Sequence, residues 1–565
     1  MERFWLKSYP KGVPADIDHT QYASIVQLFE EAFSRYRKRV AFVGMGRPMS
    51  FGELEELSKC VAAWLQAQGF SKGDRVAIMM PNVLQYPVVV AGVLRAGLVV
   101  VNVNPLYTPR ELEHQLRDSG ARAIFILENF AATLEKVLDK VKLDHVVLAS
   151  MGDLLGFAKG TLVNFVVRHV KKMVPEFSVP NASRLNSVLA DGSRKTYTHP
   201  QVGPEDVAFL QYTGGTTGLS KGATLVHRNV IANLLQSEAW LQPALNNPNK
   251  PPPPEQLVLV CALPLYHIFA LTANCLLGMR LGALNVLIPN PRDLPALIKE
   301  IRPFKVTMFP AVNTLFNALA NNEEFGKLDF SELRVSMGGG TAVQKAVAEQ
   351  WLAVTGCPIC EAYGLSETSP GASSNPTDTD KYTGTIGLPF PSTEIVILDD
   401  DGQPVPLGER GEIAIRGPQV MVGYWQHPEE TAKVMTPDGF FKSGDIGVMD
   451  ERGYTTIVDR KKDMILVSGF NVFPNEVELV VSSHPGVLEC AAIGVPDAKS
   501  GEAVKLFVVK KDEALSEREL MQYCAEQLTA YKCPRHIEFR PELPKTNVGK
   551  ILRRELRDEE LRKAA

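Results

Sequence analysis

The segment "EDVAFLQYTGGTTGLSKGATLV", Glu205–Val226, places a glycine-rich loop between two short apolar runs. Both runs have the composition of strands, and a helical pattern begins near His227. The loop, Tyr212–Ala223, combines four glycines, three threonines, a serine and a lysine. Exposed amides, hydroxyls and an ammonium group bind phosphate oxygens, so the loop is suited to holding a polyphosphate. A surface turn rich in glycine and threonine is the alternative.

Two better-known phosphate-binding patterns do not match this loop. A Walker loop runs directly into a helix after Gly-Lys-Ser/Thr, whereas Lys221 is followed by Gly222 and a second strand. The dinucleotide fingerprint Gly-x-Gly-x-x-Gly is absent as well. The remaining interpretation is a loop between two strands that grips a phosphate chain.

Outward from the loop, strand and helix patterns alternate. One series covers residues 75–80, 85–94, 98–104, 111–119 and 122–127, and a second covers 257–262, 270–281, 285–289, 294–301, 305–309 and 333–337. Thr108 before Pro109 is typical of a helix N-terminus. Because such alternation is typical of parallel sheets covered by helices, we predict two similar α/β units.

The pattern changes after residue 381. Short strands with Gly, Pro and Asp turns over 381–424 predict an antiparallel sheet or a small barrel. About a hundred residues of mixed strand and helix pattern follow the charged run Asp459–Asp463. We therefore predict an α/β protein whose large N-terminal domain has two α/β subdomains plus a small β-barrel, and whose C-terminal domain is a small, mobile α+β unit.

Composition limits the class of protein. The 565 residues are 45% hydrophobic, and 60 basic against 64 acidic residues give a net charge of -4, which argues against extensive nucleic-acid binding. Eight scattered cysteines and the lack of a signal-peptide pattern favour the cytoplasm. Cys357 and Cys360 form a CxxC pair without a second pair, so we expect them to pack in the core.

Four further motifs follow the loop in order: "EAYGLSETSP" (Glu361–Pro370), "FKSGDIG" (Phe441–Gly447), "DRKKDMILVSGFNVFPNEVE" (Asp459–Glu478) and "PKTNVGKILRREL" (Pro544–Leu556). With the glycine loop, they resemble the adenylate-forming superfamily of acyl-CoA synthetases, firefly luciferases and peptide-synthetase adenylation domains. The resemblance covers essentially the whole chain. Two segments, "SYPKGVPADID" and "GTLVNFVVRHVKKMVPEF", are most similar to bacterial long-chain fatty acid:CoA ligases.

The resemblance implies an enzyme that uses ATP, Mg²⁺ and coenzyme A. A fatty acid carboxylate attacks the α-phosphate of ATP to give an acyl adenylate and pyrophosphate, and the thiol of coenzyme A then displaces AMP. Because two anions meet in the first step, the site needs cations and donors aimed at the α-phosphate. A medium-chain or aryl, coumarate-like, acid is the alternative substrate.

Motif positions assign the nucleotide-binding residues. Lys221 is expected to be the countercharge to the departing pyrophosphate, Tyr363 to stack on adenine, and Asp445, assisted by Arg460, to bind the ribose hydroxyls. Taken singly, Tyr363 is also consistent with a core residue and Asp445 with a turn. The full expected set is Thr213, Gly214, Gly215, Thr216, Thr217, Gly218, Lys221, Gly338, Gly339, Glu361, Tyr363, Gly364, Asp445, Arg460 and Lys462.

The residues expected in catalysis are Lys550, Glu367, Ser366 and His267. Lys550 matches the family's catalytic lysine, whose flexible side chain carries a charge into a closed site; a solvated loop lysine is the alternative. Glu367 and Thr217 are expected to bind Mg²⁺, which prefers oxygen ligands. Ser366 keeps the hydroxyl where the family usually has threonine. His267 is expected to gate or position the acyl chain rather than transfer protons, with a core histidine as the alternative.

The resemblance also implies a moving C-terminal domain. One site performs two reactions in sequence, so we predict rotation about a hinge at 459–463 with Lys462 as the pivot. The predicted boundaries are 1–458 for the nucleotide- and acyl-binding domain, 459–463 for the hinge and 464–565 for the lid.

Residues 160–174 predict a basic amphipathic helix. Its apolar face is expected to hold Leu162, Val163, Val166, Val167, Val170, Met173 and Val174, and its polar face Asn164, Arg168, Lys171 and Lys172. Such a helix lies on an anionic bilayer or packs on its own domain. We predict peripheral contact with the inner face of the cytoplasmic membrane. No motif predicts an oligomeric state.

Four other functions share parts of this pattern. A peptide-synthetase adenylation domain is expected to be followed by a carrier domain, and a luciferase needs an oxygen-reactive substrate that no motif discloses. An aryl:CoA ligase stays open. A non-catalytic binding protein is disfavoured, because Glu367, Asp445, Arg460 and Lys550 are all present.

Overall fold

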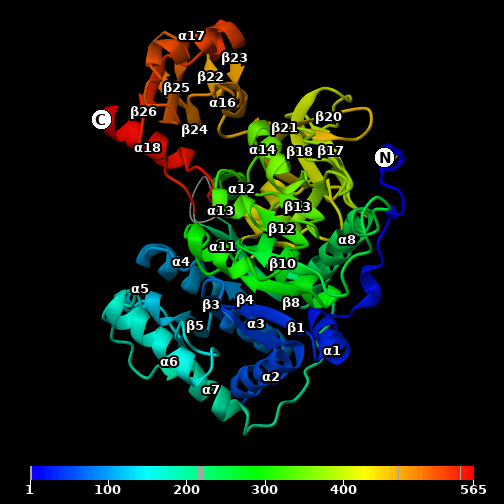
Figure 1. Cartoon of the computed structure of the whole chain (residues 1–565), viewed down its shortest axis with the longest axis vertical. Helices are drawn as coiled ribbons and strands as arrows, with labels where there is room; N and C mark the ends of the chain where they lie inside the picture. The colour runs from blue at the N-terminus through cyan, green and yellow to red at the C-terminus, as the bar shows by residue number, and fades with distance from the viewer. Residues whose placement is uncertain (1–2, 214–219, 469, 498, 547–548, 565) are drawn as a thin grey trace.

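A computed structural model describes residues 3–213, 220–468, 470–497, 499–546 and 549–564 (Figure 1). The first α/β unit contains an eight-stranded sheet, whose strands lie in the order β19 (Gly423–Tyr424), β9 (Lys221–Val226), β8 (Val207–Thr213), β4 (Val99–Asn102), β3 (Arg75–Met79), β5 (Ala123–Leu127), β6 (His145–Ala149) and β7 (Ser183–Arg184). Neighbours from β8 to β7 are parallel, and β9 and β19 are antiparallel at one edge. The first predicted α/β unit is therefore confirmed.

The second unit contains a nine-stranded sheet, in the order β16 (Leu388–Pro389), β15 (Gly371–Ser374), β14 (Ile359–Gly364), β13 (Val335–Gly338), β12 (Met308–Ala311), β10 (Val258–Cys261), β11 (Leu284–Leu287), β1 (Val40–Gly44) and β2 (Arg47–Ser50). Neighbours from β14 to β1 are parallel. Two strands from the start of the chain thus complete a sheet that otherwise forms after residue 257. The pattern of alternation did not predict this crossing.

The helices of the N-terminal part connect these strands. They are α1 (Ile25–Tyr36), α2 (Phe51–Ala67), α3 (Gln85–Arg95), α4 (Pro109–Ser119), α5 (Ala131–Glu135), α6 (Phe157–Phe165), α7 (Leu185–Gly192), α8 (His227–Leu245), α9 (Ile268–Ala270), α10 (Leu277–Leu281), α11 (Leu294–Ile301), α12 (Asn313–Ala320), α13 (Glu323–Gly326), α14 (Lys345–Thr355) and α15 (Pro428–Val434). At α4, Thr108 accepts the Glu111 amide while the Glu111 carboxylate accepts the Thr108 amide at 2.8 Å, so the predicted N-terminus is a full capping box.

Two smaller sheets follow. Within the predicted β-rich segment, two strands start an antiparallel sheet that two strands beyond residue 424 complete, in the order β17 (Glu394–Leu398), β18 (Arg410–Arg416), β20 (Phe441–Met449) and β21 (Thr455–Arg460). The C-terminal sheet has the order β23 (Phe470–Val472), β22 (Ile465–Val467), β25 (Gly501–Lys510) and β24 (Val487–Asp497), with β26 (His536–Phe539) beside β25. Its helices are α16 (Pro474–Ser482), α17 (Glu517–Gln527) and α18 (Arg553–Ala564), and they gather with the sheet at one end of the molecule (Figure 1).

The buried apolar side chains of the C-terminal domain form clusters separate from those of the rest of the chain. The largest cluster runs from Tyr22 to Met449 and joins both α/β units. Two clusters of the C-terminal domain contain only residues between Ile465 and Leu556. The small domain therefore has its own core, as a domain that folds as a unit requires.

All eight cysteines carry free thiols. Six are buried, including Cys357 and Cys360 of the CxxC pair, and Cys60 and Cys533 are half-buried. Burial is the main cause that raises the pKa of each of these thiols above its usual range. The thiols are therefore protonated at neutral pH.

Among the described residues, no helix combines the length and the apolar composition that a membrane span requires.

Candidate functional site

The glycine-rich loop joins the antiparallel strands β8 and β9, whose last pair is Thr213 with Lys221. The predicted phosphate-binding residues Gly214, Gly215, Thr216, Thr217 and Gly218 lie outside the described residues, and so does the predicted metal ligand role of Thr217. On the α4 side, a ring nitrogen of His114 lies 2.7 Å from the carbonyl oxygen of Ser220. The hairpin thus fixes Lys221 at one end of the loop.

Lys221 has two partners that the motifs did not indicate. Its ammonium forms an ion pair with Glu430 and lies 5.3 Å from the centre of the Tyr424 ring. Tyr424 belongs to β19, which pairs with β9, so the sheet itself brings the ring to the lysine. The Tyr424 hydroxyl donates a hydrogen bond of 2.8 Å to Glu367. One tyrosine therefore contacts both the predicted phosphate ligand and the predicted metal ligand.

Glu367 lies in a short 3₁₀ turn, Ser366–Thr368, directly after β14. Its side chain is buried, and burial raises its pKa, while the hydrogen bond from Tyr424 opposes that rise. In the described part of the chain, no three His, Cys, Asp or Glu side chains gather closely enough to bind a metal by themselves. A single carboxylate near a phosphate loop fits Mg²⁺, which takes its other ligands from phosphates and water. Ser366 is half-buried beside it.

The predicted ribose and adenine residues contact each other directly. The Tyr363 hydroxyl donates to Asp445 at 2.7 Å, and the other Asp445 oxygen lies 3.4 Å from Nε of Arg460. Asp445 and Arg460 are paired across β20 and β21, so the antiparallel register sets their spacing. All three side chains are buried or half-buried. A nucleotide that binds Asp445 must therefore share this carboxylate with Tyr363.

The glycines of the site allow close packing at the carboxyl ends of β13 and β14. A Cβ on Gly338 would lie 2.6 Å from a Val343 methyl, and one on Gly339 would lie 2.9 Å from the Phe269 ring. At Gly364 it would lie 1.8 Å from the carbonyl oxygen of Pro370. Only glycine is compatible with these contacts.

Glu361 pairs with Gly338 across the sheet and is buried. One carboxyl oxygen accepts the Val343 amide at 3.2 Å, and the other has no hydrogen-bond partner among the described residues. Burial raises the pKa of this carboxyl to about 8, so it is protonated at neutral pH. A protonated carboxyl at this edge of the sheet can donate a hydrogen bond.

His267 lies between β10 and α9, as predicted. Its Nδ1 accepts the Phe269 amide at 3.3 Å and caps α9. Burial, and secondarily the charge of Lys550, lower its pKa to about 4, so the ring is neutral. A neutral ring already used as a helix cap is consistent with positioning rather than proton transfer. A π-helical turn, Leu271–Leu276, follows, and such turns are frequent at functional sites.

Lys550 reaches the site from the C-terminal domain. It follows Gly549, which has a φ of +78° and whose added Cβ would lie 2.3 Å from Oγ1 of Thr314 on α12. Burial lowers the pKa of Lys550 to about 7, with smaller effects from Arg460, Asp445 and Lys462. The lysine is therefore within electrostatic range of the predicted ribose residues on one side and of His267 on the other. In this orientation of the domain, the Lys550 side chain is half-buried rather than fully solvated.

The predicted hinge carries a polar contact between the two domains. Asp459 is buried at the end of β21 and accepts the amides of Arg460 and Asn475 at 2.7 Å each. Arg553, three residues after Lys550, lies 3.4 Å from both Asp459 and Asp463. Lys462 between them is exposed. The segment that holds Lys550 is thus tied to both ends of the predicted hinge.

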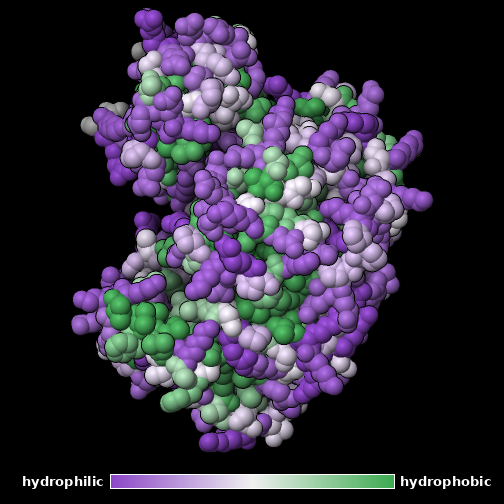
Figure 2. Space-filling model, viewed as in Figure 1, coloured by the Kyte–Doolittle hydropathy of each residue, from purple (hydrophilic) through white to green (hydrophobic). Residues whose placement is uncertain are grey.

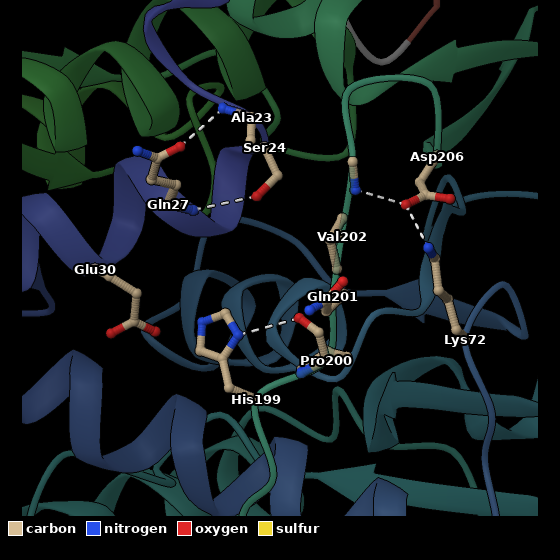
Figure 3. Close-up of a pocket in the computed structure, with 11 residues that line it drawn as sticks. Ala23, Ser24, Gln27, Glu30, Lys72, His199, Pro200, Gln201, Val202 and Asp206 are labelled. Carbon is tan, nitrogen blue, oxygen red and sulfur yellow. Dashed lines mark hydrogen bonds and ion pairs between the residues drawn. The ribbon is translucent and has the colours of Figure 1, made fainter.

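A cavity of 780 Å³ lies elsewhere, between the N-terminus of α1 and residues 199–206 (Figure 3). Its polar groups bond mainly to one another: Lys72 pairs with Asp206 at 2.6 Å, and Gln27 bonds the Ala23 amide at 2.8 Å. None of the predicted site residues lines it. The cavity therefore provides no support for a second ligand site.

Sequence reasoning missed Tyr424, Glu430 and Arg553. The first two lie in "GYWQHPEE", at and just after the end of the predicted β-rich segment, which has no known phosphate-binding pattern. Arg553 lies within a basic run that indicates only a charged helix. The strand pairing of β19 with β9 brings the first two to Lys221, and the ion pairs of Arg553 with Asp459 and Asp463 bring the third to the hinge.

A profile of the "AMP-binding enzyme" family matches residues 29–425, and that of the "AMP-binding enzyme C-terminal domain" matches 476–550. The chain is 58% identical over 560 residues to the long-chain-fatty-acid–CoA ligase of Escherichia coli O6:H1, covering 99% of this chain and 98% of the relative. It is 52% identical over 564 residues to the ligase of the same name from Haemophilus influenzae, covering 100% and 99%. Among solved structures, the anthranilate CoA ligase AuaEII in complex with anthranoyl-AMP has a TM-score of 0.83, with 27% identity and coverage of 97% and 100%.

Proposed function

The chain belongs to the AMP-binding enzyme family, and from that premise we propose that it ligates a long-chain fatty acid to coenzyme A. ATP activates the acid as an acyl adenylate with release of pyrophosphate, and the thiol of coenzyme A then releases AMP. The observation that carries the proposal is the position of the segment around Lys550, whose neighbour Gly549 packs closely against Thr314 of the N-terminal part.

In the first step, the residues act mainly through charge. A carboxylate and an α-phosphate repel each other, and we assign to Lys550 the ammonium that contacts both. Lys221 neutralises the β- and γ-phosphates, and Ser366 donates to the α-phosphate. Mg²⁺, when bound, would neutralise phosphate charge, and Glu367 would be the carboxylate that holds it, with Thr217 as the proposed second protein ligand.

The nucleotide is oriented by buried groups. Asp445 and Arg460 bind the ribose, and Tyr363 lies against adenine. The protonated carboxyl of Glu361 supplies a donor near Gly338, Gly339 and Gly364, the glycines that bound the nucleotide pocket. Tyr363 and these glycines lie at or directly after the carboxyl ends of the parallel strands β13 and β14, which is the usual ligand position of an open α/β sheet.

The acyl chain is proposed to lie beside His267 and the helical run that follows it. Leu271, Leu276 and Leu277 in this run are buried, with at most 1% of their surface exposed. The π-helical turn between α9 and α10 is a local irregularity of a kind that is frequent at functional sites. We assign His267 a positioning role at the carboxylate end of the chain.

For the second step, we propose that residues 464–565 rotate about the hinge 459–463. The contacts of Arg553 with Asp459 hold the present orientation, in which Lys550 faces the nucleotide. Rotation at Lys462 breaks them and withdraws Lys550, which makes room for the thiol. Domain 1–458 keeps the adenylate in place throughout.

A further part of the proposal concerns the membrane. The amphipathic segment is α6 followed by a π-helical turn, Val166–Val170, and the predicted division of its faces was partly wrong. Asn164 accepts the Gly152 amide at 2.7 Å, and Arg168 binds the buried Glu128 at 2.8 Å, so both point into the domain. The π turn changes the register that a regular helical wheel assumes.

The outward face is more apolar than predicted. Figure 2 shows apolar side chains gathered on the surface over α5 and α6. The exposed large side chains of this segment are Phe157 at 93%, Leu162 at 62%, Phe165 at 56%, Val170 at 64% and Met173 at 51%. Exposed Lys171 and Lys172 follow, and neither forms an ion pair with a described residue. We propose that this face contacts an anionic bilayer, which suits apolar side chains bordered by cations and supplies an insoluble substrate.

Vesicle binding tests the membrane contact. Lys171→Glu with Lys172→Glu should weaken binding to anionic vesicles by about 1 kcal/mol per charge, while activity on a soluble medium-chain acid stays unchanged. Lys381→Glu with Lys499→Glu, two exposed lysines on other elements, is the matched control. Equal vesicle binding by both double variants would contradict the proposal. The proposal would also be contradicted if Lys171→Glu with Lys172→Glu reduced self-association of the protein and left vesicle binding unchanged.

Pyrophosphate release across acids from acetate to oleate, with and without coenzyme A, tests the reaction and the substrate. Release that depends on a long acid, with acyl-CoA formed only when coenzyme A is present, is the expected result. Preference for a medium-chain acid or for coumarate would favour the alternative substrate class instead.

A further inference from the structure

We propose that Glu430 is the counterion that holds Lys221 while no triphosphate is bound and receives it again when pyrophosphate leaves. The inference rests on the proposed function, which makes Lys221 the countercharge to the β- and γ-phosphates. Glu430 acts through Lys221 and not on the substrate, so it is a positioning residue.

The fold places the Glu430 carboxylate close to the glycine-rich loop. Glu430 lies in the first turn of α15, 209 residues after its partner, and α15 begins four residues after β19 ends. Because β19 pairs with β9, the first turn of α15 is held beside Lys221, the first residue of β9. The Tyr424 ring contacts the same ammonium from β19. Lys221 is thus held at the loop by two neighbours before any ligand arrives.

The Glu430 carboxyl carries a negative charge in the folded protein. It forms ion pairs with Lys221 and, one turn along α15, with Lys433. Hydrogen bonds from these two ammonium groups lower the pKa of the carboxyl to about 2, so it is ionised at any working pH. The pair with Lys221 is therefore available whenever the phosphate site is empty.

The pair is also weak enough to exchange. The side chains of Lys221 and Glu430 are 26% and 30% exposed, so water and salt screen their attraction. A triphosphate carries several negative charges and competes well for the ammonium. A deeply buried pair would be costly to separate, which makes a half-exposed one suitable for a contact that opens in each cycle.

Binding measurements with the full-length enzyme in the absence of a fatty acid test the exchange. Glu430→Gln removes the competing charge, so ATP should bind about two- to fivefold more tightly, and pyrophosphate should inhibit at correspondingly lower concentration. AMP should bind unchanged, because it lacks the phosphates that Lys221 would contact. Unchanged AMP binding also reports that the variant is folded.

Glu429→Gln is the matched control. It removes the same charge at the neighbouring position, where the side chain is exposed and forms no ion pair with a described residue. It should leave the affinities for ATP and AMP unchanged. In a Lys221→Gln background, Glu430→Gln should have no further effect on ATP binding, because the competition requires the ammonium.

Three results would overturn the inference. Equal tightening by both glutamine variants would indicate a general charge effect. Weaker ATP binding by Glu430→Gln would mean that the carboxylate is needed to hold Lys221 in its binding position. An undiminished effect in the Lys221→Gln background would place the action of Glu430 elsewhere. Wild-type enzyme that binds neither ATP nor AMP would instead contradict the proposed function itself.

Discussion

The two sides of the site are built differently. Lys221, Tyr363 and Asp445 lie on or at the ends of strands whose apolar residues belong to the N-terminal clusters. Lys550 lies in a turn of a domain with separate cores, and it meets the other side through Gly549 against Thr314 and through the ion pairs of Arg553.

This difference indicates that the two sides have different roles in the two half-reactions. Groups fixed by sheet register are expected to keep the proposed nucleotide site constant, because moving them would disrupt a continuous core. A charge carried by a separately folded domain and held by a few polar contacts can be removed without that cost. The comparison therefore predicts that the N-terminal side serves both half-reactions and that the C-terminal side changes between them.

The largest expected effect separates the half-reactions at Lys550. Lys550→Ala should lower acid-dependent pyrophosphate release by about 10²–10³, since it removes a preorganised charge from a closed site. Conversion of supplied acyl adenylate and coenzyme A to thioester should stay near normal. Lys545→Ala is the control, because Lys545 pairs with Glu489 within its own domain at 2.6 Å. Loss of both half-reactions in a folded Lys550→Ala enzyme would contradict the division.

The independence of the small core can be tested by unfolding. Leu506 is fully buried in the C-terminal cluster, and Leu506→Ala should destabilise that domain by about 3 kcal/mol. Calorimetry should then show an earlier transition for the C-terminal domain and an unchanged one for the rest. Leu225→Ala, in the N-terminal cluster, should do the reverse. A single shared shift for both variants would show that the two parts unfold together.

A substitution in the predicted hinge should slow the half-reaction that Lys550→Ala leaves intact. Lys462→Pro fixes φ at the predicted pivot, so the domain should no longer reach its second orientation. Thioester formation from supplied adenylate should fall by about 10²-fold through misplacement, while pyrophosphate release changes far less. Lys461→Pro, one residue earlier, tests whether the pivot is specific to Lys462. Equal slowing of both half-reactions would rule out a pivot here.

The smallest expected effect is a pH dependence of the free enzyme. The pKa of Lys550 is lowered to about 7, chiefly by burial, so its charge is lost as pH rises through that value. For adenylate formation, kcat/KM should therefore fall about tenfold per pH unit above it. Bound phosphates favour the ammonium, so kcat should decline only at higher pH. Lys550→Arg should remove the decline in kcat/KM; a decline that persists must come from another group.

Local features of the fold were predictable from the sequence because their signals are short. Leu294–Ile301 is a helix with the predicted bounds, and Thr108 caps α4 as its spacing with Pro109 predicts. The strands around the glycine-rich loop were also predicted, since alternation and β-branched residues mark them directly. The residues of the site followed from motif order rather than from any physical signal within one motif.

Long-range pairing was not predictable. Nothing in β1 indicates that it pairs with β11, some 240 residues later, and the two-residue strand β19 is too short to carry a periodic pattern. The contacts of Tyr424 and Glu430 with Lys221 depend on the pairing of β19 with β9. The apolar and polar faces predicted for the segment around α6 differ from the structure for another reason. A helical wheel assumes a regular period, and the π turn at Val166–Val170 interrupts that period.

The protonated state of the cysteines bears on the selectivity of the reaction. An acyl adenylate transfers its acyl group to any thiolate that reaches it, including a thiolate of the protein. Every cysteine here is buried or half-buried with a raised pKa, so few thiolates form. We therefore expect little self-acylation and few mixed disulfides with coenzyme A. The protein's own thiols are then expected to compete poorly with coenzyme A for the activated acid.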